Sequence, residues 1–186
     1  IAQAFAVAGF DVVLTDVAEK ALQQALNTIS GSLDRLIKKE KATPEQKAAA
    51  LAKIAVGTDL GLLRDCGLII EAATENEVVK RKLFAQLDEI AQPQAILASN
   101  TSTLSITSLA AATKRPAQVI GMHFFNPVPM MALVEVTSGL QTSAATCEEI
   151  ESIARKLGKT PVKLKNSPGF VVNRLLVPMI NEAIFT

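Results

Sequence analysis

The sequence contains no tryptophan, no tyrosine and no extended block of basic residues. Its 19 lysines and arginines are nearly balanced by 18 acidic residues, which gives a formal net charge of +1 at pH 7. Nucleic-acid surfaces combine an excess of positive charge with aromatic side chains on which bases stack. Since the sequence offers neither feature, it argues against a nucleic-acid partner.

Cysteines and long apolar runs are also scarce. Cys66 and Cys147 are the only two cysteines. They lie far apart with no metal-ligand pattern around them, so we expect reduced thiols, no disulfide and no metal site. No apolar run approaches the roughly 20 residues that a membrane-spanning helix needs, and no signal segment opens the chain. The sequence therefore predicts a cytoplasmic protein without a membrane partner.

Apolar residues make up 49% of the 186 residues, which is enough for a substantial core. The chain begins without methionine at residues 1–9, a pattern typical of a helix interior that ends at a C-cap glycine. Residues 170–186 form a second apolar helical pattern, which stops without a capping residue. We therefore expect the chain to be part of a longer protein.

The single histidine, His123, lies where an extended apolar run, residues 117–125, meets a proline-rich turn. A second extended run, residues 133–136, carries Glu135, and a carboxylate in an apolar strand is costly unless it is paired or faces water. A carboxylate that orients an imidazole and stabilises its charged form yields a general base. Two simpler interpretations stay open: a structural histidine at a strand end, and a glutamate that faces solvent from an edge strand.

The first part of the chain follows a pattern of helix, strand, acid and helix. A β-rich run, residues 10–16, ends on Asp16, and residues 18–56 have helical periodicity with a break near Thr43 and Pro44, which suit a helix start. Residues 56–59 are a possible short strand. This order matches the second half of a dinucleotide-binding βαβ unit, in which such an acid hydrogen-bonds the ribose. The alternative is that Asp16 only caps a helix.

Two continuous apolar runs have the character of buried parallel strands. The first, residues 66–73, precedes Glu75 and a helix over residues 77–91 that contains Lys80. At the carboxyl end of a parallel strand both side chains would lie at the rim of a ligand crevice. The alternative is that they are ordinary charges of a helix N-terminus and its surface.

The second buried run, residues 95–99, leads through Asn100 and Ser102 into a helix over residues 105–113. Polar side chains at this strand end could contact a ligand, and a serine hydroxyl can both donate and accept. Helix capping is the alternative for this polar cluster.

The last third contains a helix over residues 142–157 and a strand over residues 160–165 with a proline near its start, as an edge strand allows. Residues 166–169 are rich in turn formers. We place a domain boundary there, between residues 1–166 and 167–186. Asn173 lies in the apolar helix that follows, where its amide needs a partner, either a ligand or the backbone.

Four motifs together resemble the 3-hydroxyacyl-CoA dehydrogenase family, most closely its bacterial 3-hydroxybutyryl-CoA dehydrogenase type. They are SNTS at residues 99–102, GMHFFNPVP at 121–129, LVE at 133–135 and NSPGFVVNR at 166–174. The resemblance implies an α/β fold: a Rossmann-like, mostly parallel sheet with helices on both faces and an inserted helical hairpin, followed by the start of an all-helical C-terminal domain. The family's first strand, its glycine-rich loop and most of that helical domain are absent from the sequence.

The resemblance also implies roles for individual residues. His123 matches the catalytic base and Glu135 the acid that orients it, while Ser102 and Asn173 match residues that hydrogen-bond the reacting substrate. The positions that match contacts to NAD are Asp16, Glu75, Lys80, Asn100 and Ser102. Ser32 and Lys39 match positions near the CoA moiety, at the basic tip of the helical hairpin.

The function implied is reversible oxidation of a short-chain (S)-3-hydroxyacyl-CoA to the 3-oxoacyl-CoA by NAD, as in fatty-acid β-oxidation. The parent protein would be a homodimer formed through the helical domain. Two alternatives stay open: a non-catalytic relative that resembles a lens crystallin, and a dehydrogenase segment of a multifunctional fatty-acid oxidation protein. Retention of all four catalytic positions argues against the first.

Overall fold

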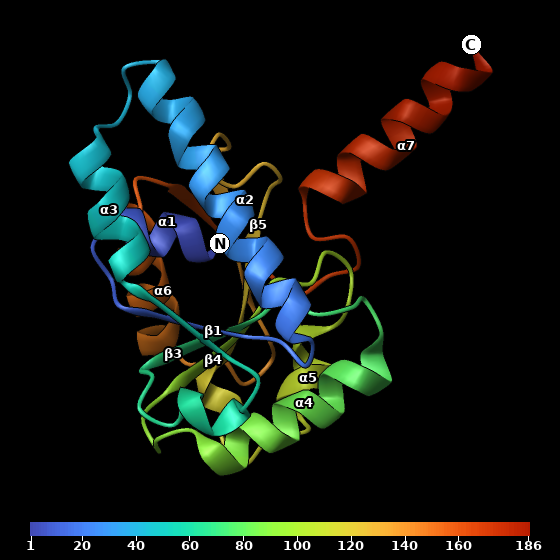
Figure 1. Cartoon of the computed structure of the whole chain (residues 1–186). Helices are drawn as coiled ribbons and strands as arrows, with labels where there is room; N and C mark the ends of the chain where they lie inside the picture. Colours follow the sequence, from blue (N-terminus) through green and yellow to red (C-terminus); the bar gives the residue numbers. More distant parts are fainter. The chain divides into compact units, whose positions relative to one another are not determined.

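The computed structural model describes all residues, 1–186, and shows a mixed α/β protein that divides into two compact units (Figure 1). Unit 1 comprises Ile1–Arg64 and Asn126–Met130, and unit 2 comprises Asp65–Phe125 and Met131–Thr186. This division differs from the predicted boundary between residues 166 and 167, which stays a prediction. Each unit has its own sheet.

Unit 1 is a two-stranded parallel sheet with helices. Its elements are α1 (Ala2–Val7), β1 (Val12–Thr15), α2 (Glu19–Lys38), α3 (Pro44–Ala52), β2 (Ile54–Gly57) and the 3-10 helix η1 (Leu60–Leu63). α2 and α3 form the expected helical hairpin. Thr43 Oγ1 accepts the Gln46 N–H and Gln46 Oε1 accepts the Thr43 N–H, with Pro44 in the first turn, so the predicted helix start at Thr43 is confirmed.

The predicted helical periodicity up to residue 56 is wrong at its end. Helix α3 stops at Ala52, and the following residues pair with β1 as strand β2, with Ile54 opposite Val12. The β-branched side chains of Ile54 and Val56 suit a strand, and the pairing partner lies 42 residues earlier in the chain. The core of the unit is apolar and is formed by Ala6, Ile29, Leu33 and Ala50.

Unit 2 contains a five-stranded sheet in the order β3-β4-β5-β6-β7, in which only the β5–β6 pair is antiparallel. The mostly parallel α/β architecture is therefore confirmed. Its elements are β3 (Leu68–Glu71), α4 (Glu77–Ile90), β4 (Ile96–Ser99), α5 (Ile106–Ala110), η2 (Pro116–Gln118), β5 (Val119–Phe124), β6 (Leu133–Ser138), α6 (Ala144–Lys156), β7 (Thr160–Lys165) and α7 (Val172–Phe185).

Helices α5 and α6 lie on opposite faces of this sheet. Gly121 in β5 faces α5 so closely that an added Cβ would come within 3.0 Å of Ile106 Cδ1. Ile120, the neighbour of Gly121 in β5, points to the other face and pairs with Ser138 of β6. The Ser138 hydroxyl lies 3.0 Å from Cys147 Sγ of α6. Glycine at 121 therefore allows α5 to approach the strand that carries the histidine.

Two predicted helices are shorter than expected. α5 covers only Ile106–Ala110, with Ser105 as its N-cap, where residues 105–113 were predicted. α7 begins at Val172 because Phe170 has a left-handed backbone, with φ of 50°. Strand β7 has the predicted bounds, 160–165, and occupies the predicted edge position.

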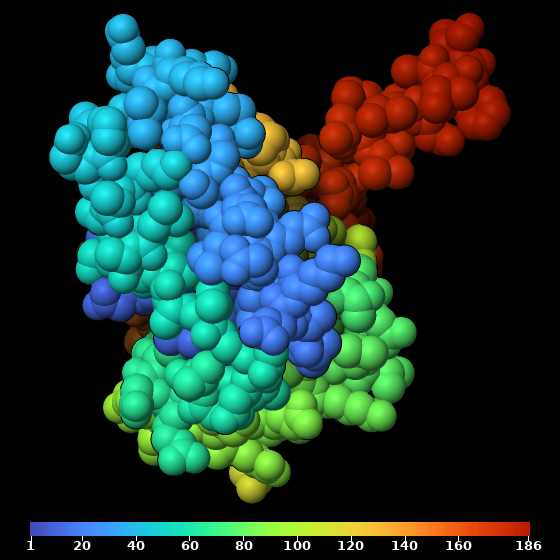
Figure 2. Space-filling view, viewed as in Figure 1, coloured from blue at the N-terminus to red at the C-terminus, as the bar shows by residue number.

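Helix α7 has no buried residue, although most of its side chains are apolar. Figure 2 shows the helix, in red, with its side chains uncovered. The exposed apolar residues are Leu175, Leu176, Val177, Met179, Ile180, Ile184 and Phe185. An apolar helix of this kind is typical of a packed interior rather than of a solvated surface.

Candidate active site

His123 and Glu135 are cross-strand partners in the antiparallel strands β5 and β6. The imidazole Nδ1 lies 2.8 Å from Glu135 Oε2, and the two residues are only 5% and 2% exposed. The expected meeting of histidine and glutamate is confirmed, and the glutamate does not face solvent. Since a carboxylate only accepts, the neutral ring carries its proton on Nδ1 and leaves Nε2 as an acceptor.

Ser102 lies at the other nitrogen of the ring. Its hydroxyl is 3.1 Å from His123 Nε2. Strand β4 brings it there, because Ser99 pairs with Gly121 and the loop after β4 therefore runs beside the end of β5. The result is a row of carboxylate, imidazole and hydroxyl, the arrangement in which an imidazole accepts a proton from an alcohol.

Two aromatic rings enclose the imidazole. Phe125 lies 4.6 Å from His123 between ring centroids, and Phe170 lies 5.8 Å away in an edge arrangement. Phe170 is 1% exposed. Apolar rings on the imidazole keep water from competing for its hydrogen bonds and strengthen its interaction with the carboxylate.

The second oxygen of Glu135 is also engaged. Oε1 accepts the backbone N–H of Val171 at 3.1 Å and that of Val172 at 2.9 Å, at the start of α7. The carboxylate thus has a partner on each oxygen, and its burial is compensated.

Glu75 organises the loop that carries Ser102. Its Oε1 accepts hydrogen bonds from the Thr101 hydroxyl at 2.5 Å, the Ser102 N–H at 2.9 Å and the Thr103 N–H at 3.2 Å. Burial, the largest single influence, raises the pKa of Glu75, but these bonds and the charge of Lys80 together bring the pKa below its usual value. The structure therefore places Glu75 as an acceptor beneath Ser102.

Lys80 is 1% exposed and is not at an open rim. Its Nζ lies 2.6 and 2.8 Å from the two oxygens of Glu71 and 3.6 Å from Glu75 Oε2. Glu71 also accepts from the Ser99 hydroxyl at 2.7 Å. The sequence analysis missed Glu71, although the signal was available, since it is an acid at the end of an apolar strand, as Glu135 is in its own strand.

The two asparagines differ. Asn100 Oδ1 accepts the Phe124 N–H at 2.8 Å, which fixes the loop against β5 and leaves its NH₂ group without a partner in the structure. Asn173, in the first turn of α7, is half-buried and its side chain makes no hydrogen bond. The structure therefore brings Ser102, His123 and Glu135 together but does not join Asn173 to them.

The remaining predicted residues belong to unit 1. Asp16 follows β1 and is exposed; its Oδ1 accepts the Ala18 N–H at 2.9 Å and its Oδ2 has no partner. Ser32 lies within α2, and Lys39 is the exposed C-cap residue of that helix. Neither Ser32 nor Lys39 makes a side-chain hydrogen bond in the structure.

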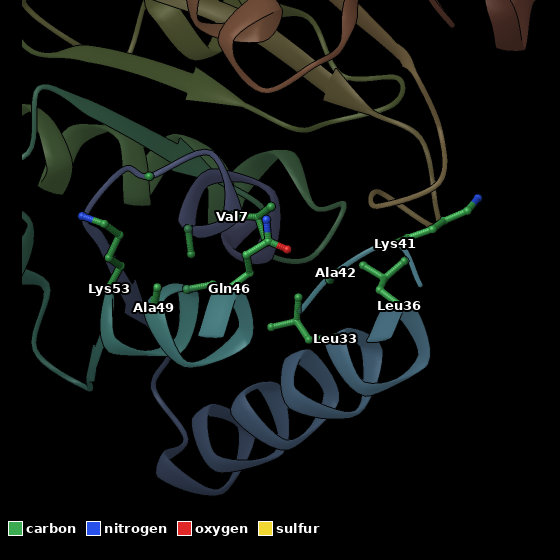
Figure 3. Close-up of a pocket in the computed structure, with 11 residues that line it drawn as sticks. Val7, Leu33, Leu36, Lys41, Ala42, Gln46, Ala49 and Lys53 are labelled. Carbon is green, nitrogen blue, oxygen red and sulfur yellow. The ribbon is translucent and has the colours of Figure 1, made fainter. Parts of the chain in front are cut away.

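A pocket of about 250 Å³ lies among α1, α2 and α3 (Figure 3). Its lining is mostly apolar, and Figure 3 shows the Lys41 and Lys53 side chains at its margins. Neither Ser32 nor Lys39 lines it. The structure shows no cluster of three or more His, Cys, Asp and Glu that could hold a metal ion. It also shows no helix long and apolar enough to cross a membrane.

Comparisons with known proteins identify the family. The model of the 3-hydroxyacyl-CoA dehydrogenase NAD binding domain matches residues 1–167. The 3-hydroxybutyryl-CoA dehydrogenase of Bradyrhizobium diazoefficiens is 50% identical over 186 residues, all of this chain and 64% of its own length. The enzyme of the same name from Clostridioides difficile is 47% identical over 99% of this chain and 66% of its own length.

A solved structure gives the same result. The crystal structure of (S)-3-hydroxybutyryl-CoA dehydrogenase PaaH1 from Ralstonia eutropha is similar with a TM-score of 0.96 and 55% identity, over 98% of this chain and 64% of that one. The chain thus spans about two thirds of the length of the relatives it matches.

Proposed function

Because the chain belongs to the 3-hydroxyacyl-CoA dehydrogenase family and its residues 1–167 match the family's NAD binding domain, we propose that the full protein catalyses the reversible oxidation of (S)-3-hydroxyacyl-CoA to 3-oxoacyl-CoA. A short acyl chain, as in 3-hydroxybutyryl-CoA, is supported by the names of the most similar relatives. The observation that carries the proposal is the row formed by Glu135, His123 and Ser102.

In the proposed oxidation His123 is the general base. Its Nε2 takes the proton of the substrate's 3-hydroxyl, while the hydrogen on C3 leaves with its electron pair and the C–O bond becomes a carbonyl. NAD, when bound, supplies the acceptor for that hydride. Glu135 keeps Nε2 unprotonated in the resting state by accepting at Nδ1, and it stabilises the imidazolium once the proton has moved.

Ser102 and Asn173 are proposed to bind the reacting part of the substrate. The Ser102 hydroxyl lies 3.1 Å from His123 Nε2. A substrate oxygen that bonds to Nε2 would therefore lie close to this hydroxyl, which can hold it in line with the base. The unpartnered amide of Asn173 is available for a second hydrogen bond, since nothing else in the structure uses it.

The donor set suits a dinucleotide. Asp16 stands at a strand end with one carboxylate oxygen free, as an acceptor for ribose hydroxyls requires. Asn100 offers a free NH₂ group, and Ser102 a hydroxyl, on the loop after β4. Glu75 and Lys80, also proposed at the cofactor site, act chiefly through the loop that they hold in place, because Lys80 is buried.

Ser32 and Lys39 are proposed to contact the CoA portion. Both lie in or next to the last two turns of α2, and Lys39 is an exposed cation that suits a phosphate. We further propose a cytoplasmic homodimer. The exposed apolar side chains of α7 support burial of that helix against other protein.

The test is NADH oxidation by the full-length protein with 3-oxoacyl-CoA substrates of increasing chain length. We expect the highest kcat/KM with acetoacetyl-CoA and a marked preference for NADH over NADPH, because a carboxylate at Asp16 repels a 2′-phosphate. Turnover that is absent with every acyl-CoA would contradict the proposed activity, and equal use of NADPH would contradict the role of Asp16.

A further inference from the structure

The carboxylate of Glu135 joins two segments that are far apart in the sequence. Its Oε2 accepts from His123 Nδ1 at 2.8 Å, and its Oε1 accepts from the N–H groups of Val171 and Val172, 36 and 37 residues further along. Each oxygen thus has its own kind of donor. Two backbone donors at the start of a helix also favour negative charge at that place.

The residues just before α7 are held against the same site. Phe170 has a φ of 50°, a left-handed conformation that bulky side chains rarely adopt. Its ring is buried and meets the His123 imidazole edge-on. The turn is closed by the Phe170 N–H on Ser167 O at 3.0 Å, and Asn166 Oδ1 accepts the Ile106 N–H at 2.9 Å. The connection is therefore fixed at several points, one of which is the imidazole itself.

Beyond its first turn α7 has no such attachment. None of its residues is buried. The helix is thus joined to the rest of unit 2 through its N-terminal turn and the connection before it, and that turn lies directly on the carboxylate that orients His123.

We propose that residues 170–172 are a positioning element of the active site. The two N–H groups at the start of α7 fix which oxygen of Glu135 faces the ring, and Phe170 fixes the ring against that oxygen. The N-terminal turn of α7 thereby fixes the orientation of the carboxylate that sets the tautomer of His123, and it couples the placement of α7 to proton transfer. The coupling to catalysis rests on the proposed function, whereas the orientation of the Glu135 side chain does not.

The substitution Glu135→Gln tests whether the two N–H groups orient the side chain at position 135, with the tautomer of His123 as the readout. A glutamine has one acceptor oxygen, and the two N–H groups of Val171 and Val172 require it, so the NH₂ group must turn toward His123 Nδ1. The neutral ring then carries its proton on Nε2 instead of Nδ1. His123 is the single histidine of these 186 residues, and comparison with the His123→Gln variant identifies its signals, so ¹⁵N NMR of the imidazole reports the tautomer.

We expect the Nδ1–H form in the unchanged protein and the Nε2–H form in the Glu135→Gln variant, at a pH where the ring is neutral. A Glu135→Gln variant that keeps the Nδ1–H form would overturn the proposal. The double variant Glu135→Gln/Val172→Pro lacks one of the two donors, and we expect it to regain a measurable share of Nδ1–H.

A second pair of variants keeps glutamate in place. Val172→Pro removes the N–H that lies 2.9 Å from Glu135. It also disfavours the helical backbone of Val171, with φ of −109° and ψ of −51°, so it disturbs both donors, whereas Val172→Ala keeps them. For Val172→Pro we expect solvent exchange of the Nδ1 proton to rise and kcat to fall by about tenfold, with an unchanged Kd for NADH. Val172→Ala should match the unchanged protein. Equal exchange and equal kcat in the two variants would contradict the proposal. If the tautomer changes as expected but the protein is inactive on all acyl-CoAs, the proposed function is contradicted and the positioning role of residues 170–172 is not.

Discussion

Unit 2 contains two buried glutamates on strands, each paired with a basic side chain, and the two pairs differ in what surrounds the base. Lys80 Nζ contacts both oxygens of Glu71 and approaches Glu75, and it is 1% exposed. His123 contacts Glu135 with one nitrogen and reaches the Ser102 hydroxyl with the other. The ammonium group is enclosed by carboxylates, whereas the imidazole has a second nitrogen that faces a hydroxyl.

This difference separates a structural pair from the pair that we propose to be catalytic. An ammonium group only donates, so Lys80 has nothing to offer a substrate proton while both carboxylates surround it. A neutral imidazole donates at one nitrogen and accepts at the other, so Glu135 can hold it without blocking its chemistry. A buried carboxylate on a strand is therefore no sign of catalysis by itself. What matters is whether its basic partner keeps an atom that can accept a proton.

The largest expected effect is on turnover and concerns the pair His123 and Glu135. His123→Gln keeps a side chain of similar size but removes the base, so kcat of the full-length protein should fall by about 10²- to 10⁴-fold while the Kd for NADH stays close to that of the unchanged protein. Steady-state NADH oxidation with acetoacetyl-CoA and a fluorescence titration with NADH measure the two quantities. Near-normal turnover would place the base elsewhere.

The next largest effect is on stability and concerns the pair Lys80 and Glu71. Lys80→Met leaves Glu71 buried without its cation, which should lower the free energy of unfolding by about 3–5 kcal/mol. Lys82→Met, an exposed lysine of the same helix, should change it by less than about 0.5 kcal/mol. Urea unfolding measures both. A double variant, Glu71→Met/Lys80→Met, should recover much of the loss, and equal stability of Lys80→Met and Lys82→Met would contradict the account.

A smaller effect on turnover is expected at the Ser102 hydroxyl, which lies beside His123. Ser102→Ala removes one hydrogen bond to Nε2 and should lower kcat/KM by about tenfold. Thr113→Ala is a matched control, because its hydroxyl bonds only the Ala110 carbonyl, at 2.9 Å. If the two variants have the same kcat/KM, Ser102 has no part in orienting the substrate.

The smallest effect concerns pH. The pKa of Glu75 lies below its usual value of 4.5 in the folded protein. Its contribution to stability is therefore fully present above that value and is lost as the pH falls through the lowered pKa. Because Glu75 is partly exposed, we expect a contribution of no more than about 1 kcal/mol. We compare the free energy of unfolding in urea from about pH 6 to about pH 3. Glu75→Gln should lose less stability on acidification than the control Glu89→Gln. Identical dependence of the free energy of unfolding on pH in the two variants would contradict this.

The sequence predicted most of the architecture and the central pair. Alternation of apolar runs with helical patterns gave the parallel strands β3 and β4, and the cost of a carboxylate in an apolar strand pointed to a partner for Glu135. That partner lies on the adjacent strand of an antiparallel pair, only 12 residues away, so local pattern was enough to bring the two together.

The rest depends on long-range contacts that no local pattern contains. Lys80 was predicted at an open rim, because helical periodicity does not reveal that the carboxylate of Glu71 lies beneath it. The two N–H groups on Glu135 belong to a helix start that the apolar pattern placed at residue 170, since nothing local predicts a left-handed Phe170. Strand β2 was predicted only as a possible short strand at residues 56–59, and its true start at Ile54 depends on pairing with β1, which precedes the whole helical hairpin.

The most direct test compares the same substitution at the two strand glutamates. In the full-length protein kcat with acetoacetyl-CoA and NADH is measured for Glu135→Gln and for Glu71→Gln, on samples shown by circular dichroism to be folded. The account predicts a loss of about 100-fold or more for Glu135→Gln and a change within about threefold for Glu71→Gln. Equal losses, or a larger loss at Glu71, would contradict it.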